Sequence, residues 1–83
     1  MTYFVYVLGT YDNKKLITYV GYTNNLEKRL NLHNTGKGAK FTKGRVWKLM
    51  YYEKYLTKNE AISREYYIKK NRKFRNLIKK KFR

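Results

Sequence analysis

The sequence predicts an α+β fold with elements in the order β-β-α-β-α-α. Three observations predict it. Two runs of aromatic, β-branched and leucine residues near the start are separated by a polar stretch, and a third such run lies in the middle of the chain. Helix-capping patterns precede the remaining segments. At 83 residues the chain has room for one small core, so we expect a single domain spanning residues 1–83.

The first two strands form a predicted hairpin. Thr2–Leu8 consists of Thr, aromatic, β-branched and Leu residues, and Leu16–Tyr22 is a second run of this type. Between them, Gly9–Lys15 is rich in turn-forming and polar residues, which predicts a loop. Farther along, Val46–Tyr55 is rich in aromatic residues and predicts the third strand.

Capping residues mark the first helix. Asn24 is a good N-cap residue, and Glu27 follows it three residues later. The helix that they begin should end near Gly36, where a basic loop punctuated by glycines starts.

Two further helices are predicted after the third strand. The sequence of Thr57–Glu60 is that of a capping box, and it opens a helix in which Ala61, Glu65 and Ile68 share one face. Asn71 is placed to cap a final basic helix over residues 71–83.

Charge sets the strongest limit on partners. The chain has 21 Lys and Arg against 5 Asp and Glu, a net charge of +16. Such a field favours polyanions, so nucleic acid is the leading partner and an anionic membrane the alternative. Nothing approaches the roughly 20 apolar residues of a spanning helix, and Tyr3–Leu8 lacks the length and basic lead of a signal peptide. We expect a soluble cytoplasmic protein without a membrane partner.

The absence of cysteine excludes other classes. Without cysteine there is neither a disulfide framework nor a thiolate metal cage, and with one histidine there is no two-histidine zinc site. The glycines at 36, 38 and 44 fit neither a dinucleotide fingerprint nor a P-loop.

Arg29 and His33 are candidate phosphate-binding residues. They lie four positions apart, on one side of the predicted first helix. An ordinary solvated helix face with an incidental histidine explains the same spacing, so the pair alone does not establish a site.

Glu65 is a more informative candidate, because it is the only acidic residue after Ala61 in a strongly basic segment. Its helical neighbours Ala61 and Ile68 place the carboxylate on or beside a packed face. A partly buried carboxylate needs a partner. That partner is either Mg²⁺, which often binds only one or two protein carboxylates, or a basic side chain in a salt bridge.

The 10 tyrosines divide into core residues and surface residues able to stack on bases. Strand alternation places Tyr6 on one face with Phe4 and Leu8, and gives Tyr19 the same parity as Ile17. A buried tyrosine pair near Arg29 could orient or deprotonate a water molecule.

The order of several short motifs carries a family resemblance. The stretch Phe4–Leu8 includes Val-Tyr in the place of Ile-Tyr, and Tyr19–Gly21 reads Tyr-Val-Gly. Gly21–Leu30 matches G-x-T-x-x-L-x-x-R-L. The subsequent matches are to an H-N pair, a GKGAKYT loop and a helix A-x-x-R-E-x-x-I-K, at His33-Asn34, Gly36–Thr42 and Ala61–Lys69.

From Tyr3 to Lys69 this order resembles the GIY-YIG nuclease domain. It is most similar to the small stand-alone bacterial proteins related to the amino-terminal domain of the excinuclease component that carries this motif. The chain departs from the family pattern where Phe4 replaces the glycine of GIY, and similarity fades beyond Lys69. Many members also have an Asn downstream of the glutamate, for which Asn71 and Asn76 are candidates.

The resemblance implies a three-stranded antiparallel sheet flanked by helices and a set of functional residues. By position, Tyr6 and Tyr19 are the motif tyrosines, Arg29 is the catalytic arginine, His33 lies one turn later, and Glu65 binds one Mg²⁺ or Mn²⁺. Tyr6 or Tyr19, aided by His33, would orient or deprotonate the attacking water. Arg29 would donate hydrogen bonds to the phosphate.

The function thus implied is a metal-dependent DNA endonuclease of low sequence specificity that prefers single-stranded or distorted DNA, with a role in DNA repair. A non-catalytic DNA- or RNA-binding module is the alternative, and a ribosome-associated protein is a third reading. The predicted nucleic-acid contacts are Lys37, Lys40, Lys43, Arg45, Lys69 and Lys70.

Overall fold

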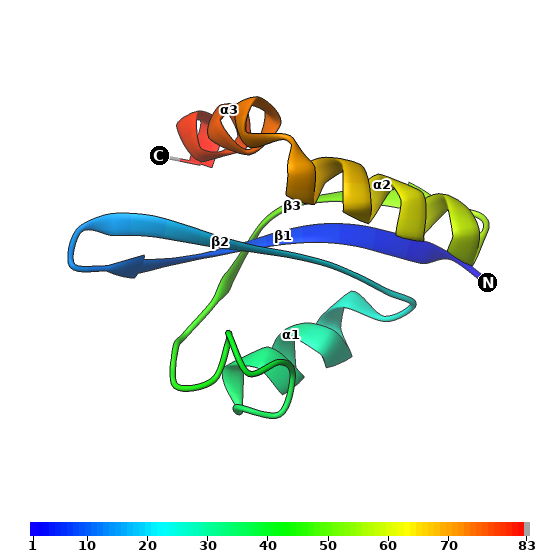
Figure 1. Ribbon diagram of the computed structural model, residues 1–83. Helices are drawn as coiled ribbons and strands as arrows, with labels where there is room; N and C mark the ends of the chain where they lie inside the picture. Colours follow the sequence, from blue (N-terminus) through cyan, green and yellow to red (C-terminus); the bar gives the residue numbers. More distant parts are fainter. Residues whose placement is uncertain (83) are drawn as a thin grey trace.

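The computed structural model describes residues 1–82 as a three-stranded sheet with helices on both faces (Figure 1). All neighbouring strands are antiparallel, in the order β2-β1-β3. The strands are β1 (Tyr3–Asp12), β2 (Lys15–Thr23) and β3 (Lys48–Tyr55), and the helices are α1 (Leu26–Asn34), α2 (Lys58–Lys70) and α3 (Arg72–Phe82). This confirms the predicted fold class and element order.

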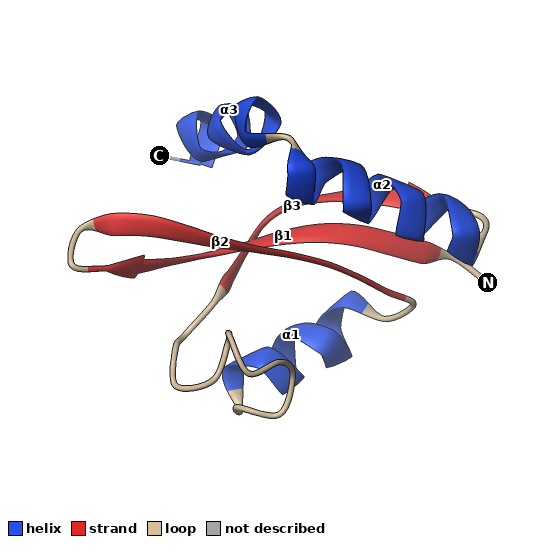
Figure 2. Ribbon diagram, viewed as in Figure 1, coloured by secondary structure: helices blue, strands red, loops and turns tan. Residues whose placement is uncertain are grey.

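The helices divide between the two faces of the sheet. Helix α1 and the long loop that follows it lie on one face, and α2 and α3 lie on the other (Figure 2). The predicted final helix corresponds to α3, and Arg83 lies outside the described residues. Within residues 1–82, no helix is long and apolar enough to cross a membrane.

The hairpin of β1 and β2 is longer than predicted. Asp12 pairs with Lys15, so only Asn13 and Lys14 form the turn. Both turn residues have positive φ angles, 51° and 68°, as a type I′ turn requires. The prediction of a loop over Gly9–Lys15 was therefore wrong in length. The far end of the hairpin is exposed, so its strands need no apolar residues and carry no compositional signal.

The first helix begins one residue later than predicted. Asn25, not Asn24, is its N-cap, and the Asn25 side chain accepts a hydrogen bond of 3.1 Å from the backbone N–H of Lys28. The Thr23 hydroxyl accepts a 3.1 Å hydrogen bond from the backbone N–H of Asn25, which fixes the chain just before the helix. Either asparagine satisfies the capping pattern, and this local turn selects the second.

The other predicted caps are confirmed. Thr57 accepts the backbone N–H of Glu60 at 3.2 Å, and Asn71 accepts that of Phe74 at 3.0 Å. Strand β3 starts two residues after the predicted Val46. The reason is Trp47, whose backbone N–H and C=O bind a side chain of α1 instead of a neighbouring strand.

Side-chain alternation along β1 creates two small cores. On the α2 face, Val5 and Val7 pack with residues of β2, α2 and α3, and on the α1 face Tyr6 and Leu8 pack with Trp47. The two faces are thus filled by separate sets of residues, and β1 contributes to both.

A polar cluster ties α2 to β3. Arg64 donates two hydrogen bonds to the Glu53 carboxylate, from Nε at 2.8 Å and from a terminal nitrogen at 3.0 Å. The Tyr51 and Tyr55 hydroxyls donate to the same carboxylate. Because Arg64 directly precedes Glu65, this clamp also fixes the position of Glu65 along the sheet.

Candidate active site

Three side chains from β1 and α1 form a connected hydrogen-bond chain on the α1 face. The Tyr6 hydroxyl lies 2.9 Å from Nε2 of His33, and Nε of Arg29 donates to the Tyr6 oxygen at 3.4 Å. Tyr6 and His33 are buried, with 1% and 0% of their surfaces exposed, and Arg29 is half-buried. The chain therefore runs from the protein interior toward the surface.

Arg29 and His33 share one side of α1, as their spacing predicted, and that side faces the sheet. The reading of an ordinary solvated face is wrong for His33, which is fully buried. The side chain of His33 bonds at both ring nitrogens, whereas a solvated histidine needs no such partners.

Gly21 leaves the space that the Tyr6 ring occupies. A Cβ atom at Gly21 would lie 2.3 Å from the Tyr6 hydroxyl oxygen and 2.6 Å from Cζ. The ring of Tyr6 therefore crosses the neighbouring strand at this glycine and points toward the β2 edge of the sheet. Helix α2, which carries Glu65, packs against β1 and β2 on the other face.

Tyr19 has a different environment from Tyr6. Its ring packs edge-on against His33, with 5.0 Å between ring centroids, and stacks on Phe41 at 6.2 Å. Among the described residues, the Tyr19 hydroxyl makes no hydrogen bond, so only one of the two motif tyrosines is bonded to the histidine.

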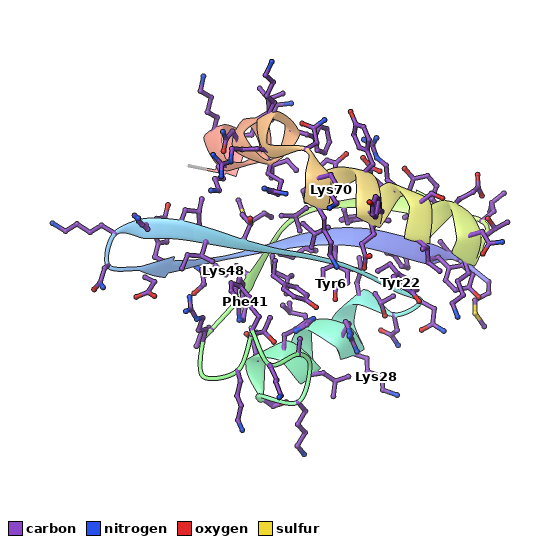
Figure 3. The ribbon with its side chains drawn as sticks, in the orientation of Figure 1. Tyr6, Tyr22, Lys28, Phe41, Lys48 and Lys70 are labelled. Carbon is purple, nitrogen blue, oxygen red and sulfur yellow. The ribbon has the colours of Figure 1, made fainter. Side chains whose placement is uncertain are left out.

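Two hollows meet at Arg29. One is an apolar cavity of about 290 Å³ that Tyr6 also lines. The other is an open depression of about 390 Å³, lined by Arg29 with Tyr22, Lys58 and three other residues. Figure 3 shows Tyr6 and Tyr22 in the layer between the strands and α1. The guanidinium group therefore stands where a phosphate can approach from solvent.

Glu65 is the metal ligand that the resemblance implies. Its side chain is 18% exposed, and its polar contact in the described structure is an ion pair with Lys69 at 3.5 Å. Both partners expected from the sequence, a cation and a basic side chain, are compatible with this geometry, because a 3.5 Å contact to a half-exposed lysine on the next helical turn is weak.

The donor set fits a hard cation with few protein ligands. Residues 1–82 contain no group of three or more His, Cys, Asp or Glu side chains able to enclose a metal. Glu65 offers one carboxylate, and Mg²⁺ or Mn²⁺ can take waters and substrate oxygens as its remaining ligands. The carboxylate of Glu53, by contrast, is consumed by Arg64 and two tyrosines.

Burial and charge set the protonation states in the chain. Burial raises the pKa of Tyr6, the hydrogen bond and charge of Arg29 oppose that rise, and the charge of Glu65 adds slightly to it. Burial, followed by the charge of Arg29, lowers the pKa of His33. The hydrogen bond to Tyr6 raises the pKa of Arg29. At neutral pH, Tyr6 is therefore protonated, His33 neutral and Arg29 charged.

The far side of His33 contains residues that sequence reasoning missed. Nδ1 of His33 lies 2.8 Å from the Thr42 hydroxyl, and Thr42 is fully buried. The Asn34 side chain binds the Trp47 backbone at 2.6 and 3.1 Å, and the Trp47 indole N–H donates to the Thr42 carbonyl at 3.0 Å. The H-N pair and the GKGAKYT loop contain Asn34 and Thr42, but the motif gives neither a role.

The predicted nucleic-acid contacts separate into two groups. Lys37, Lys40 and Lys43 are exposed on the loop that follows α1. Lys69 and Lys70 lie near the end of α2, on the opposite face of the sheet. The structure therefore does not bring these lysines into one patch.

Arg45 is held within the protein. It forms an ion pair with Asp12 at 3.5 Å, and its guanidinium lies over the Phe41 ring, 5.5 Å from the centroid. Of the two downstream asparagines, Asn71 caps α3 and donates to the Tyr67 hydroxyl at 2.9 Å. Asn76 is exposed on α3.

The order of these residues can be compared with known proteins. A family model described as the GIY-YIG catalytic domain matches residues 2–80. The chain belongs to the GIY-YIG family. This confirms the resemblance drawn from the motifs, and the GIY-YIG domain implies a nuclease-type function that acts on nucleic acid.

Small bacterial proteins are among the relatives. A UPF0213 protein of Oceanobacillus iheyensis is 46% identical over 76 residues, covering 90% of this chain and 85% of that protein. One from Clostridium perfringens is 54% identical over 68 residues, covering 81% and 70%. The solution NMR structure of a UPF0213 protein from Bacillus halodurans matches the GIY-YIG fold with a TM-score of 0.52 and 34% identity, covering 92% of this chain and 79% of that one.

Proposed function

We propose that this GIY-YIG protein is a divalent-metal-dependent endonuclease that hydrolyses phosphodiester bonds in DNA. The observation that carries the proposal is the hydrogen-bond chain of Arg29, Tyr6 and His33, which joins a phosphate-binding group to a proton-accepting pair. The proposal takes residues 1–83 as one nuclease domain. It also places the protein in the cytoplasm, where a bacterial chromosome supplies the substrate.

Tyr6 and His33 perform the proton transfer in this mechanism. A water oxygen attacks the phosphorus atom, and the water proton passes to the Tyr6 oxygen while Tyr6 passes its own proton to Nε2 of His33. The bond between phosphorus and the leaving oxygen breaks, and that oxygen takes a proton from solvent. Because the pKa of Tyr6 is raised and that of His33 lowered, the protons move together with the attack rather than before it.

Arg29 binds the phosphate. Its Nε–H is used by Tyr6, which leaves the terminal nitrogens for the non-bridging phosphate oxygens. Hydrolysis concentrates negative charge on these oxygens, so a half-buried guanidinium stabilises the transition state more than the ground state.

Glu65 would hold the cation, with Mg²⁺ and Mn²⁺ as the two candidates. When bound, the cation supplies Lewis-acid stabilisation of the phosphate and the leaving oxygen. The carboxylate suits this role because its ion pair with Lys69 is long and half-exposed, so a cation can replace the lysine at small cost.

Several features support low sequence specificity. No separate recognition element accompanies the site, so base edges have no obvious reader. Exposed lysines on the loop, Lys37, Lys40 and Lys43, provide phosphate contacts that carry no sequence information. Exposed aromatic side chains such as Phe41, which stacks on Tyr19, favour unpaired bases. Single-stranded or distorted DNA is therefore the proposed substrate.

The proposal is tested with Glu65→Gln, which keeps the shape of the side chain and removes its charge. Glu60→Gln is the matched control, because Glu60 is an exposed residue of the same helix. We expect the wild type and Glu60→Gln to cut single-stranded, branched or gapped DNA with Mg²⁺ or Mn²⁺, and Glu65→Gln to lose cleavage while still binding DNA. Equal cleavage by Glu65→Gln would contradict the assignment. Equal cutting of intact duplex would contradict the substrate preference.

A non-catalytic nucleic-acid-binding module is the second candidate, favoured by the net charge of +16. It predicts no metal-dependent cleavage by any variant, binding that weakens steeply with salt, and no effect of Glu65→Gln on binding. Preferential co-purification with RNA would identify its ligand as RNA.

A further inference from the structure

The Thr42 hydroxyl has a fixed hydrogen-bond direction. A hydroxyl group has one proton and two acceptor lone pairs. The Thr42 oxygen lies 2.9 Å from the carbonyl oxygen of Ala39 and 3.2 Å from the Ala39 backbone N–H. A carbonyl oxygen can only accept and an N–H can only donate. The hydroxyl proton therefore goes to the carbonyl, and one lone pair takes the N–H.

What remains on Thr42 is a single lone pair, and it faces Nδ1 of His33 at 2.8 Å. An acceptor at this distance requires a donor, so the imidazole proton lies on Nδ1. Because the pKa of His33 is lowered by burial and the ring is neutral, Nε2 carries no proton. The contact with Thr42 thus determines which ring nitrogen is the acceptor.

The other end of the chain leads to the same result independently. Nε of Arg29 can only donate, so the Tyr6 oxygen accepts its hydrogen. The Tyr6 proton is then directed to Nε2 of His33, 2.9 Å away, which must be unprotonated to accept it. Both ends of the network require one tautomer.

We propose that Thr42 is a positioning residue that holds His33 in the Nδ1–H tautomer, so that Nε2 accepts the proton of Tyr6. The catalytic part of this inference rests on the proposed nuclease function, whereas the tautomer does not. In the other tautomer, Nε2–H would donate to the Tyr6 oxygen, and the histidine could not accept a proton from Tyr6.

The loop around Thr42 is built to keep this contact. A Cβ atom at Gly38 would lie 2.3 Å from Nδ1 of His33, so the loop backbone packs directly on the imidazole ring. The indole of Trp47 holds the Thr42 carbonyl at 3.0 Å, and Asn34 holds the Trp47 backbone. Thr42, Trp47 and His33 are all fully or almost fully buried, so water does not replace the hydroxyl.

The test uses Thr42→Val, which keeps the branched shape and removes the hydroxyl, and Thr42→Ser, which restores it. The chain has one histidine, so a nitrogen-15 NMR spectrum of the untagged protein contains one imidazole signal pair. At neutral pH we expect the Nδ1–H tautomer in the wild type and Thr42→Ser, and a shift toward Nε2–H in Thr42→Val. A wild type protonated on Nε2, or an unchanged tautomer in Thr42→Val, would overturn the proposal.

Cleavage kinetics test the catalytic part separately. For Thr42→Val we expect kcat to fall roughly 10–100-fold, the usual effect of losing a residue that orients a functional histidine. KM should stay unchanged, and Thr42→Ser should recover most of kcat. A wild-type kcat in a Thr42→Val protein with a shifted tautomer would refute the positioning role. If even the wild type cuts no DNA, the nuclease proposal fails while the tautomer result stands. Should Thr42→Val not fold, the wild-type tautomer and the Thr42→Ser kinetics still decide.

Discussion

The hydroxyl of Tyr6 can be removed without changing the rest of the ring, and Tyr19 provides a matched comparison. In Tyr6→Phe the bonds to His33 at 2.9 Å and to Arg29 at 3.4 Å are lost. In Tyr19→Phe no hydrogen bond to a described residue is lost, although the Tyr19 ring also packs on His33. The pair of variants therefore separates the role of the hydroxyl from that of the ring.

The expected size of the effect follows from burial. His33 is fully buried, so the loss of the Tyr6 hydroxyl leaves Nε2 as an acceptor without a donor. An unsatisfied buried acceptor costs about 1–3 kcal/mol of unfolding free energy, and in a domain of this size each kcal/mol lowers Tm by about 4–8 °C. Tyr19→Phe should change the free energy by no more than about 0.5 kcal/mol.

Urea unfolding monitored by the fluorescence of the single tryptophan, Trp47, measures the stability difference. Cleavage of single-stranded DNA measures activity, and we expect Tyr6→Phe to lose about 10²–10⁴-fold, the contribution of a positioned proton-transfer group. In a His33→Ala background, Tyr6→Phe should cost little more, because the two groups act in series. Equal losses in Tyr6→Phe and Tyr19→Phe, or a fully active Tyr6→Phe, would refute the reasoning.

Three further predictions concern stability. Arg64→Ala should lower the unfolding free energy by about 1.5–3 kcal/mol, because Glu53 loses two charged hydrogen bonds; an unchanged urea midpoint would argue against the clamp. Gly21→Ala should displace the Tyr6 ring, because the added Cβ would lie 2.3 Å from its hydroxyl oxygen; unperturbed ring signals of Tyr6 by NMR would contradict this. Burial lowers the pKa of His33 from 6.5, so the unfolded chain takes up this proton first, and the unfolding free energy should fall as the pH drops from 7 through the folded-state pKa; a rise on acidification would contradict it.

Local patterns predicted the elements well where one side chain and one backbone group decide the structure. The caps at Thr57 and Asn71 were predicted because each accepts an N–H three residues ahead. The first cap was misplaced by one residue because Asn24 and Asn25 satisfy the same pattern. The hairpin turn at Asn13 and Lys14 was missed because exposed strand ends lack an apolar signal.

The candidate site was predictable in its charged members and not in its neutral ones. The unusual carboxylate of Glu65 and the spacing of Arg29 and His33 are visible in the sequence. The roles of Thr42 and Asn34 depend on how a long loop folds back on α1, with partners nine and thirteen residues away. Threonine and asparagine are common in loops, so composition offers no sign of such contacts.

The arrangement of the two cores has a consequence for when the protein can act. His33 and Arg29 come from the layer of α1 and its loop, Glu65 comes from the layer of α2 and α3, and each layer packs on its own face of the sheet. A chain in which either layer has not yet packed therefore lacks part of the proposed site. Nascent or partly unfolded molecules would bind nucleic acid through their charge without cutting it, which protects the chromosome from an enzyme still being made.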